Sequence, residues 1–156
     1  MQQDLHFYQF ALDSAKEGLA EGGIPIGAAL VIDGKVIATG RNQRIQKDSA
    51  IHHGETNCIE NAGRLKAEDY KKATLYTTLS PCAMCTGTAL LYGIPRVVIG
   101  ENKNFMGEEE LLKSRGVEVV VLNHPETEKM MGDFIAKNPS LWNEDIGEEE
   151  MRNEKV

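Results

Sequence analysis

The sequence predicts an α/β fold in which helices cover a sheet. Segments rich in β-branched residues alternate along the chain with segments whose apolar residues recur at helical spacing, a pattern typical of layered α/β domains. The chain has 156 residues, of which 41% are hydrophobic. That is enough for one sizeable core and too little for two ordinary domains. We therefore expect residues 1–156 to form a single domain.

A helix and a hairpin are expected first. Apolar residues recur at helical spacing over residues 4–21, and Gly22-Gly23 indicates the end of that helix. The next two segments, 26–32 and 36–40, flank the pair Asp33-Gly34. This pair tolerates the positive backbone angles of a tight turn, so we expect two antiparallel strands.

The middle of the chain is predicted as helix, strand and helix. After an irregular stretch that ends near His53, residues 55–65 favour a helix, and residues 74–79 have the β-branched and aromatic content of a strand. Ser80-Pro81 then favours the start of another helix, because Ser is a good N-cap and Pro fits the first helical position. We expect that helix to run to Tyr92.

The last third of the chain alternates between strands and helices. The pattern predicts, in order, a strand over 97–100, a helix over 108–115, a strand over 118–122 and a helix over 126–138. Pro139 then begins a short tail. We expect the acidic end of this tail, beyond Gly147, to be solvent-exposed.

Charge and cysteine content disfavour several classes of protein. The net charge of -7 provides no excess of positive charge with which to bind a phosphate backbone, so we expect no nucleic-acid partner. Residues 1–10 lack a basic region followed by an apolar stretch, and no apolar run is long enough to cross a bilayer. We therefore expect a cytoplasmic protein with no membrane partner. Three cysteines, two of them close together, suit metal binding or catalysis better than a disulfide framework.

Two short pieces of sequence carry the candidate chemistry. They are His53-Gly54-Glu55 and Pro81-Cys82-Ala83-Met84-Cys85, each at the expected entrance to a helix. Cys82 and Cys85 are three positions apart on a first helical turn, so both sulfurs can face His53. Zinc suits these donors, and three ligands leave a fourth position open, as in catalytic zinc sites. We predict that Zn²⁺ is held by these three residues, with Glu55 free to transfer protons.

The order of these two pieces is more specific than either piece alone. H-x-E followed by P-C-x-x-C is the signature of zinc nucleobase deaminases, in which the Glu is not a ligand. Over nearly its whole length, the chain also resembles the fungal cytosine deaminases of the cytidine-deaminase-like superfamily. The matching stretches are 22–27, Asn42, 53–55, 75–82, 92–96, 100–102, Trp142 and 144–147.

The resemblance implies a three-layer α/β/α sandwich around a mixed five-stranded sheet, assembled as a homodimer. It also implies that the side chain of Asn42 and the backbone NH of Gly54 bind the base, and that the carbonyl of Ser80 meets the leaving amino group. The residues expected to complete and cover the pocket are Phe105, Trp142 and Asp145. We expect residues 139–147 to close over the substrate.

Some positions keep simpler interpretations open. The role of Asn42 could simply be to form a turn, and the role of Trp142 could simply be to anchor the last helix. Cys58 is expected to be a buried apolar residue. Ala83 stands where the fungal pattern has an acidic residue, and Ile45 stands where it has an aromatic one. These two departures bear on substrate preference and leave the chemistry unchanged.

The favoured reaction is hydrolysis of free cytosine to uracil and ammonia, which would serve pyrimidine salvage. Glu55 would move protons first to N3 of the ring and then to the departing ammonia. The alternatives are deamination of guanine, isocytosine or a related azine, deamination of tRNA adenosine, and a structural zinc module. A tRNA substrate would need a basic surface, and a structural site usually has a fourth protein ligand.

Overall fold

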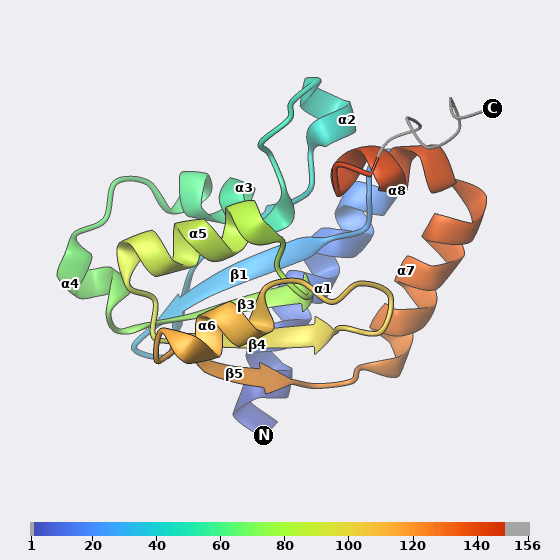
Figure 1. The fold of residues 1–156 in the computed structure, drawn as a ribbon. Coiled ribbons are helices and arrows are strands. Elements are labelled where there is room, and N and C mark those ends of the chain that lie inside the picture. Colours follow the sequence, from blue (N-terminus) through green and yellow to red (C-terminus); the bar gives the residue numbers. More distant parts are fainter. Residues whose placement is uncertain (1, 149–156) are drawn as a thin grey trace.

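A mixed five-stranded sheet forms the centre of the protein (Figure 1). The computed structural model describes residues 2–148. The strands are β1 (Gly27–Ile32), β2 (Lys35–Arg41), β3 (Ala73–Leu79), β4 (Arg96–Glu101) and β5 (Glu118–Val121). They lie in the order β2-β1-β3-β4-β5, and β1 pairs antiparallel with both neighbours, whereas β3, β4 and β5 run parallel. The predicted strands and the mixed sheet are confirmed.

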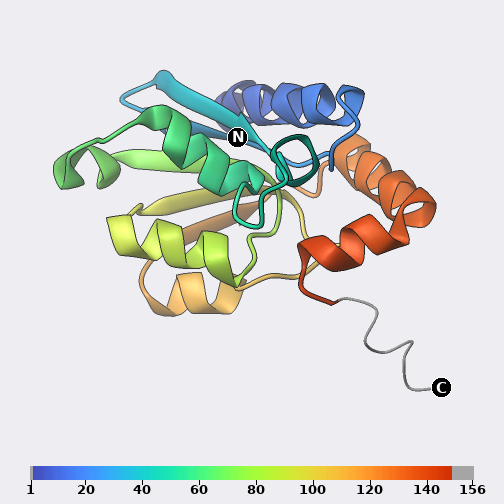
Figure 2. The same cartoon turned by 90° about the horizontal axis from the view of Figure 1, so that it is seen from above.

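Helices cover both faces of this sheet. They are α1 (Gln2–Ala20), α2 (Arg44–Lys47), α3 (Gly54–Ala62), α4 (Ala67–Tyr70), α5 (Ala83–Tyr92), α6 (Glu109–Ser114), α7 (Pro125–Lys137) and α8 (Pro139–Asp145). Figure 2 shows α3, α5 and α6 on one face and α1 with α7 on the other, which confirms the three-layer α/β/α sandwich. Within the described residues, no helix has the length and apolar character needed to cross a membrane.

The strand β1 divides its side chains between the two cores. Leu30 belongs to the core under α3, α5 and α6, whereas Ala29 and Val31 belong to the core under α1. This alternation follows from the two-residue period of a strand, and every residue of β1 is buried. A third apolar cluster lies where α7 and α8 meet the sheet, and it includes Ile26 and Trp142.

Two glycine positions shape the first part of the sheet. Asp33 and Gly34 have φ angles of 51° and 73°, as the tight β1–β2 turn requires. A β-carbon on Gly40 of β2 would lie 2.2 Å from the backbone nitrogen of Cys58 in α3. Only glycine therefore lets α3 pack directly on β2, and this contact positions the first turn of α3.

Three helices were not expected from the sequence. The short helices α2 and α4 occupy stretches without a clear helical pattern, and the segment after Pro139, expected as a tail, forms α8. Each is seven residues or shorter, so hydrophobic periodicity gives little signal. Beyond α8, Gly147 and Glu148 are exposed. The rest of the acidic end, residues 149–156, lies outside the described residues.

The expected boundaries of two helices were also wrong. The helix predicted to start at Ser80-Pro81 begins at Ala83, with Cys82 as its N-cap residue. The Ser80 hydroxyl donates instead to Glu109. The helix predicted to reach Leu65 ends at Ala62, where Gly63 takes a φ of 80°.

A buried ionic contact ties α1 to the sheet. The carboxylate of Asp4 accepts two hydrogen bonds of 2.7 Å from Arg96 of β4 and one of 2.8 Å from the hydroxyl of Tyr76 of β3. Hydrogen bonding from Arg96 is the main reason that the pKa of Asp4 lies below its ordinary value of 3.8, although burial opposes this shift. Such a paired carboxylate stabilises the fold while it is ionised.

Asp4→Asn is expected to lower the free energy of unfolding by about 1–3 kcal/mol at neutral pH, because the charge-assisted bonds are lost. The lowered pKa means that this stabilisation is present above pH 3.8 and is lost as the pH falls through the folded-state value. Urea unfolding of parent and variant at neutral and at strongly acidic pH checks this. Glu118→Gln is the control, because Glu118 pairs with the same Arg96 but its side chain is 63% exposed. An equal difference at both pH values would contradict the assignment.

Candidate metal centre and pocket

The candidate metal ligands lie at the beginnings of two helices. His53 is the N-cap residue of α3, Cys82 is the N-cap residue of α5, and Cys85 lies in the first turn of α5. The positive end of each helix dipole therefore points towards the three donors. This field favours the thiolate form of cysteine, which is the form that binds metals.

The donor atoms are spaced as a tetrahedral zinc ion requires. Nδ1 of His53 lies 3.5 Å from Sγ of Cys82 and 3.7 Å from Sγ of Cys85. Ordinary zinc–sulfur and zinc–nitrogen bond lengths place such atoms about 3.6 Å apart at a tetrahedral ion. All three donors lie within 4.8 Å of one another, and among the described residues no fourth histidine, cysteine or carboxylate joins this group. The residues present therefore fit a three-ligand zinc site.

The protein shifts the pKa values of the two cysteines in opposite directions. The hydrogen bond from Cys85 lowers the pKa of Cys82 to about 4, with a further contribution from His53, although burial opposes the shift. The same hydrogen bond, together with burial, raises the pKa of Cys85. One thiolate is thus stabilised by the protein alone, and a coordinating metal favours deprotonation of the second thiol.

Asp145 of α8 supports the imidazole of His53 from the side away from the sulfurs. Oδ1 of Asp145 lies 3.4 Å from Nε2 of His53 and accepts a 2.8 Å hydrogen bond from the side-chain nitrogen of Asn42. Arg44 approaches the same oxygen at 3.7 Å. A carboxylate behind a ligating histidine fixes the orientation of its ring and makes it a better ligand.

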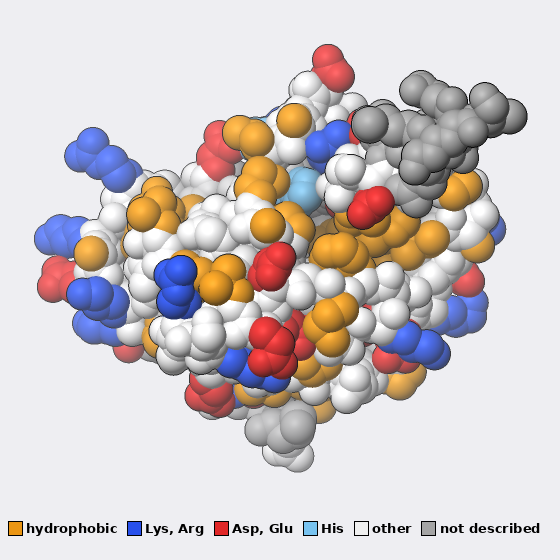
Figure 3. Space-filling view, in the orientation of Figure 1, with side chains coloured by type: hydrophobic (Ala, Val, Ile, Leu, Met, Phe, Trp, Pro, Cys, Tyr) orange, Lys and Arg blue, Asp and Glu red, His pale blue; other side chains and the backbone are white. Residues whose placement is uncertain are grey.

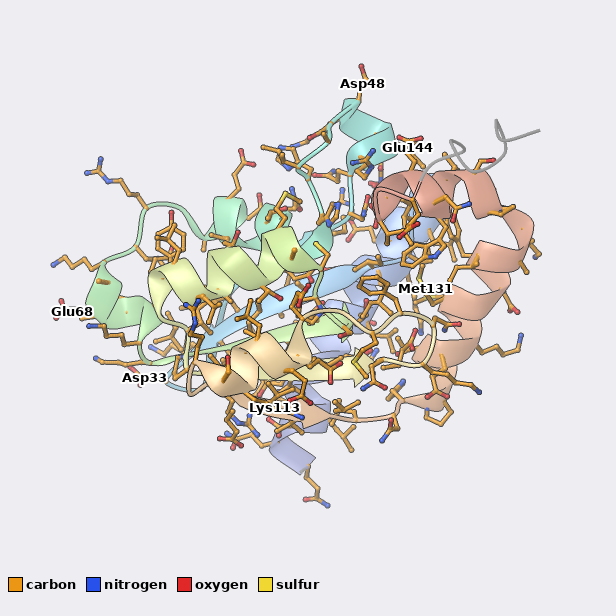
Figure 4. The ribbon with its side chains drawn as sticks, in the orientation of Figure 1. Asp33, Asp48, Glu68, Lys113, Met131 and Glu144 are labelled. Atoms are coloured by element: carbon orange, nitrogen blue, oxygen red, sulfur yellow. The ribbon has the colours of Figure 1, made fainter. Side chains whose placement is uncertain are left out.

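A further ion pair connects α8 with α2. Arg44 binds the carboxylate of Glu144 at 3.0 Å, and Figure 4 shows Glu144 on the side of α8 near α2. The guanidinium of Arg44 also donates to the carbonyl of Ala50. Sequence reasoning missed Arg44, because the importance of Arg44 depends on the position of α8.

Glu55 lies beside the donors without joining them. Its side chain is in the first turn of α3, and only 4% of the residue is exposed. Burial raises the pKa of Glu55 to about 7, and the negative charge of Cys82 adds to the shift. A carboxyl group with this proton affinity can both accept and donate a proton near neutral pH.

These residues enclose a small pocket. The residues that line it are Ile26, His53, Glu55, Leu79, Ser80, Cys82, Phe105, Trp142, Asp145 and Ile146. The rings of Phe105 and Trp142 meet edge to face, with centroids 5.8 Å apart. The pocket has only about 20 Å³ of free space, and part of its wall, formed by Trp142, Asp145 and Ile146, lies in or directly after α8. A larger groove of about 440 Å³ runs along α1 and α7, but no candidate metal ligand lines it.

The structure brings most of the predicted site residues together. Asn42 and Gly54 do not line the closed pocket. Asn42 is fully buried behind Asp145, and its Oδ1 accepts from the backbone nitrogen of Arg44. Gly54 is the first residue of α3, where a backbone NH has no partner within the helix. Their predicted roles in binding the base therefore stay predictions.

Other histidines and cysteines lie away from the donors. His52 pairs with Glu60, so the H-x-E spacing selected the correct neighbour in His53. Cys58 is fully buried in the core under α3, as expected. The pocket also contains Ile26 and Leu79, which sequence reasoning placed only in strands.

The family model for the cytidine and deoxycytidylate deaminase zinc-binding region matches residues 1–101. The chain belongs to this family. Its zinc-binding character agrees with the three donors, so zinc is the cofactor.

Individual relatives extend the match beyond the family region. A cytosine deaminase from Candida albicans is 58% identical over 141 residues, covering 90% of this chain and 94% of that protein. A tRNA-specific adenosine deaminase from Streptococcus pyogenes is 36% identical over 116 residues, covering 71% of each protein. The solved structure of a guanine deaminase from Nitrosomonas europaea has a TM-score of 0.69 at 20% identity, covering 83% of each chain, and supports the fold.

Cys85→Ala is expected to abolish stoichiometric zinc binding, because it removes one of three donors. Elemental analysis of the purified proteins should give about one zinc per chain in the parent. Cys58→Ala is the matched control, because Cys58 is also buried but its sulfur contacts the carbonyl of Ala38. The control should keep its zinc. Full zinc occupancy in Cys85→Ala would contradict the assigned site.

Proposed function

We propose that this chain catalyses the hydrolysis of free cytosine to uracil and ammonia. The reaction is that of a hydrolase acting on the C–N bond of a cyclic amidine. The observation that carries the proposal is a small pocket in which two metal donors, a buried carboxyl group and two aromatic rings meet, with the third donor, Cys85, beside the other two. The Candida albicans cytosine deaminase, which matches 90% of the chain, supports cytosine as the substrate.

Glu55 is the residue that moves protons. Zinc, when held by His53, Cys82 and Cys85, supplies a Lewis acid to the reaction. Two thiolate ligands reduce the net positive charge of this centre, so a nearby base is needed to take the proton of the attacking water. The raised pKa of Glu55 lets it take one proton of the attacking water and deliver it to N3 of the ring, and then carry the second proton of the same water to the departing ammonia.

The remaining predicted site residues hold the base. The carbonyl of Ser80 accepts a hydrogen bond from the amino group that leaves, while Asn42 and the backbone NH of Gly54 bind the ring. Phe105 and Trp142 pack against the apolar faces and exclude water. Asp145 uses Oδ1 for its contacts with protein groups. We assign Oδ2 to the NH at N1 of free cytosine.

Residues 139–147 act as the lid of the pocket. Trp142, Asp145 and Ile146 all line the pocket, and all lie in or directly after α8. Because these residues form part of the wall of a small pocket, movement of α8 would widen it for entry of cytosine. Closure of such a lid removes water from the reacting groups.

Two of the three alternatives are weaker. A structural zinc module usually has a fourth protein ligand, and none joins the cluster within residues 2–148. A tRNA substrate is disfavoured by the net charge of -7. Another free base, such as guanine or isocytosine, or a related azine fits the same chemistry. Ile45 and Ala83, the two departures from the fungal pattern, are exposed and do not line the closed pocket.

A cytoplasmic homodimer that serves pyrimidine salvage agrees with these features. The cytosol keeps cysteines reduced, as the ligands Cys82 and Cys85 require. Apolar side chains gather on the face that α5 covers (Figure 3). Leu91 and Met106 are 74% and 61% exposed, and Tyr92 is 40% exposed. Exposed apolar side chains of this kind suit contact with a second copy of the chain.

Glu55→Gln is expected to keep zinc bound and to lower kcat for cytosine by roughly two to four orders of magnitude, since general acid–base steps contribute that much. Steady-state kinetics and zinc analysis of the same preparation check both parts. Glu60→Gln is the control, because Glu60 is on the same helix but 63% of its side chain is exposed. Near-normal turnover of Glu55→Gln would remove Glu55 from the mechanism.

Free cytosine is expected to be accepted and cytidine refused, by a factor of about 10⁴ or more in kcat/KM. A sugar at N1 removes the NH that Asp145 needs and collides with α8. An ammonia-release screen of free bases and nucleosides, followed by kinetics of Asp145→Ala at known zinc content, tests this. The variant should discriminate less well, whereas Glu144→Gln, a change at its exposed neighbour, should not.

Comparable values for cytosine and cytidine in the parent would rule out the selectivity. If the parent and Asp145→Ala discriminate equally between cytosine and cytidine, the shape of the pocket alone explains the preference. Zinc must be measured because Asp145 also contacts His53.

A further inference from the structure

A second buried carboxylate lies next to the pocket and has no part in the proposed reaction. Glu109, the first residue of α6, is only 4% exposed. Its Oε2 accepts a 2.6 Å hydrogen bond from the hydroxyl of Ser80, and its Oε1 accepts one of 3.3 Å from the side chain of Asn102. No lysine or arginine in the described part of the chain forms an ion pair with it.

Burying a carboxyl group without a cation has a cost, so the contacts that it makes are informative. The 2.6 Å distance between Glu109 and the Ser80 hydroxyl is in the range of charge-assisted hydrogen bonds. A serine hydroxyl that donates to a carboxylate still has lone pairs with which to accept. The hydroxyl of Ser80 uses one of them for the backbone nitrogen of Gly107, at 2.9 Å.

Ser80 is therefore held from several directions. Its backbone nitrogen donates to the carbonyl of Glu101 at 3.0 Å, and the carbonyl of the next residue, Pro81, accepts from Glu108 at 3.0 Å. Ser80 is 3% exposed and lines the pocket two positions before the donor Cys82. The backbone is thus hydrogen-bonded on both sides of Ser80, and the Ser80 hydroxyl links this segment to Glu109.

The same network holds the loop that carries Phe105. A β-carbon on Gly107 would lie 1.9 Å from the carbonyl oxygen of Pro81, so this loop lies directly on the Ser80-Pro81 backbone. Phe105 lines the pocket and contacts Trp142. Loss of the Glu109 carboxylate would thus loosen a pocket wall and the carbonyl that faces the leaving group.

We propose that Glu109 is a positioning residue, which acts through the Ser80 hydroxyl to hold the Ser80 carbonyl where the departing amino group needs an acceptor. The inference rests on the proposed deamination, because that reaction gives the carbonyl its role. Glu109 itself touches neither the substrate nor the metal donors. Its effect falls on the chemical step more than on binding of the product uracil, which has lost the amino group.

A double-mutant cycle tests the coupling between Glu109 and Ser80. Glu109→Ala and Ser80→Ala are each expected to lower kcat for cytosine by about tenfold or more, with zinc content and uracil affinity close to the parent's. The double variant should be no slower than the slower single variant, because both changes break the same contact. Glu109→Gln should recover part of kcat, because its amide oxygen can still accept from Ser80.

Glu110→Ala is the matched control, since Glu110 is the next residue of α6 and its side chain is 92% exposed. Multiplicative losses in the double variant, a parent-like kcat in Glu109→Ala, or a loss explained wholly by missing zinc would overturn the proposal. If Glu109→Ala does not fold, Glu109→Leu, which fills a similar space but has no oxygen that can accept from Ser80, takes its place in the cycle, and a kcat equal to the parent's then counts against the role. The ammonia-release screen distinguishes failure of this inference from failure of the proposed function. If the parent deaminates another base in place of cytosine, cytosine is not the substrate, and the cycle is run with that base.

Discussion

The N-terminal ends of α3 and α5 meet at one edge of the sheet, and the metal centre depends on this meeting. His53 and Cys82 are both N-cap residues, so their side chains project from the points where the two helix dipoles are most positive. The backbone contact between Gly40 and α3 fixes the direction of the first of these helices. Donors on rigid elements are preorganised, which limits the rearrangement that binding a metal requires.

Much of the fold could be predicted because its strands and long helices have strong periodic patterns. The hairpin followed from Asp33-Gly34, whose positive φ angles are observed. The short helices α2, α4 and α8 were missed because one or two turns contain too few apolar positions to show a period. The start of α5 was misplaced because local propensity favoured Ser80 as a cap, whereas a tertiary hydrogen bond to Glu109 recruits its hydroxyl.

The metal donors could be predicted because their relation is local, with two cysteines on one helical turn and a histidine two residues before a glutamate. The support around them depends on long-range contacts. Asn42 and Asp145 are 103 positions apart, and Ser80 and Glu109 are 29 apart. No spacing rule connects such pairs. The resemblance to a family pointed to Asp145, but its second contact, with His53, required the folded chain.

The position of Trp142 has a practical consequence. It is the single tryptophan of the chain, it is 6% exposed, and it lines the pocket beside Phe105. Indole emission depends on the polarity and the quenching groups around the ring. The intrinsic tryptophan fluorescence of the protein therefore originates entirely at the pocket wall. The molecule contains its own optical probe, through which ligand entry can be followed in real time without a label.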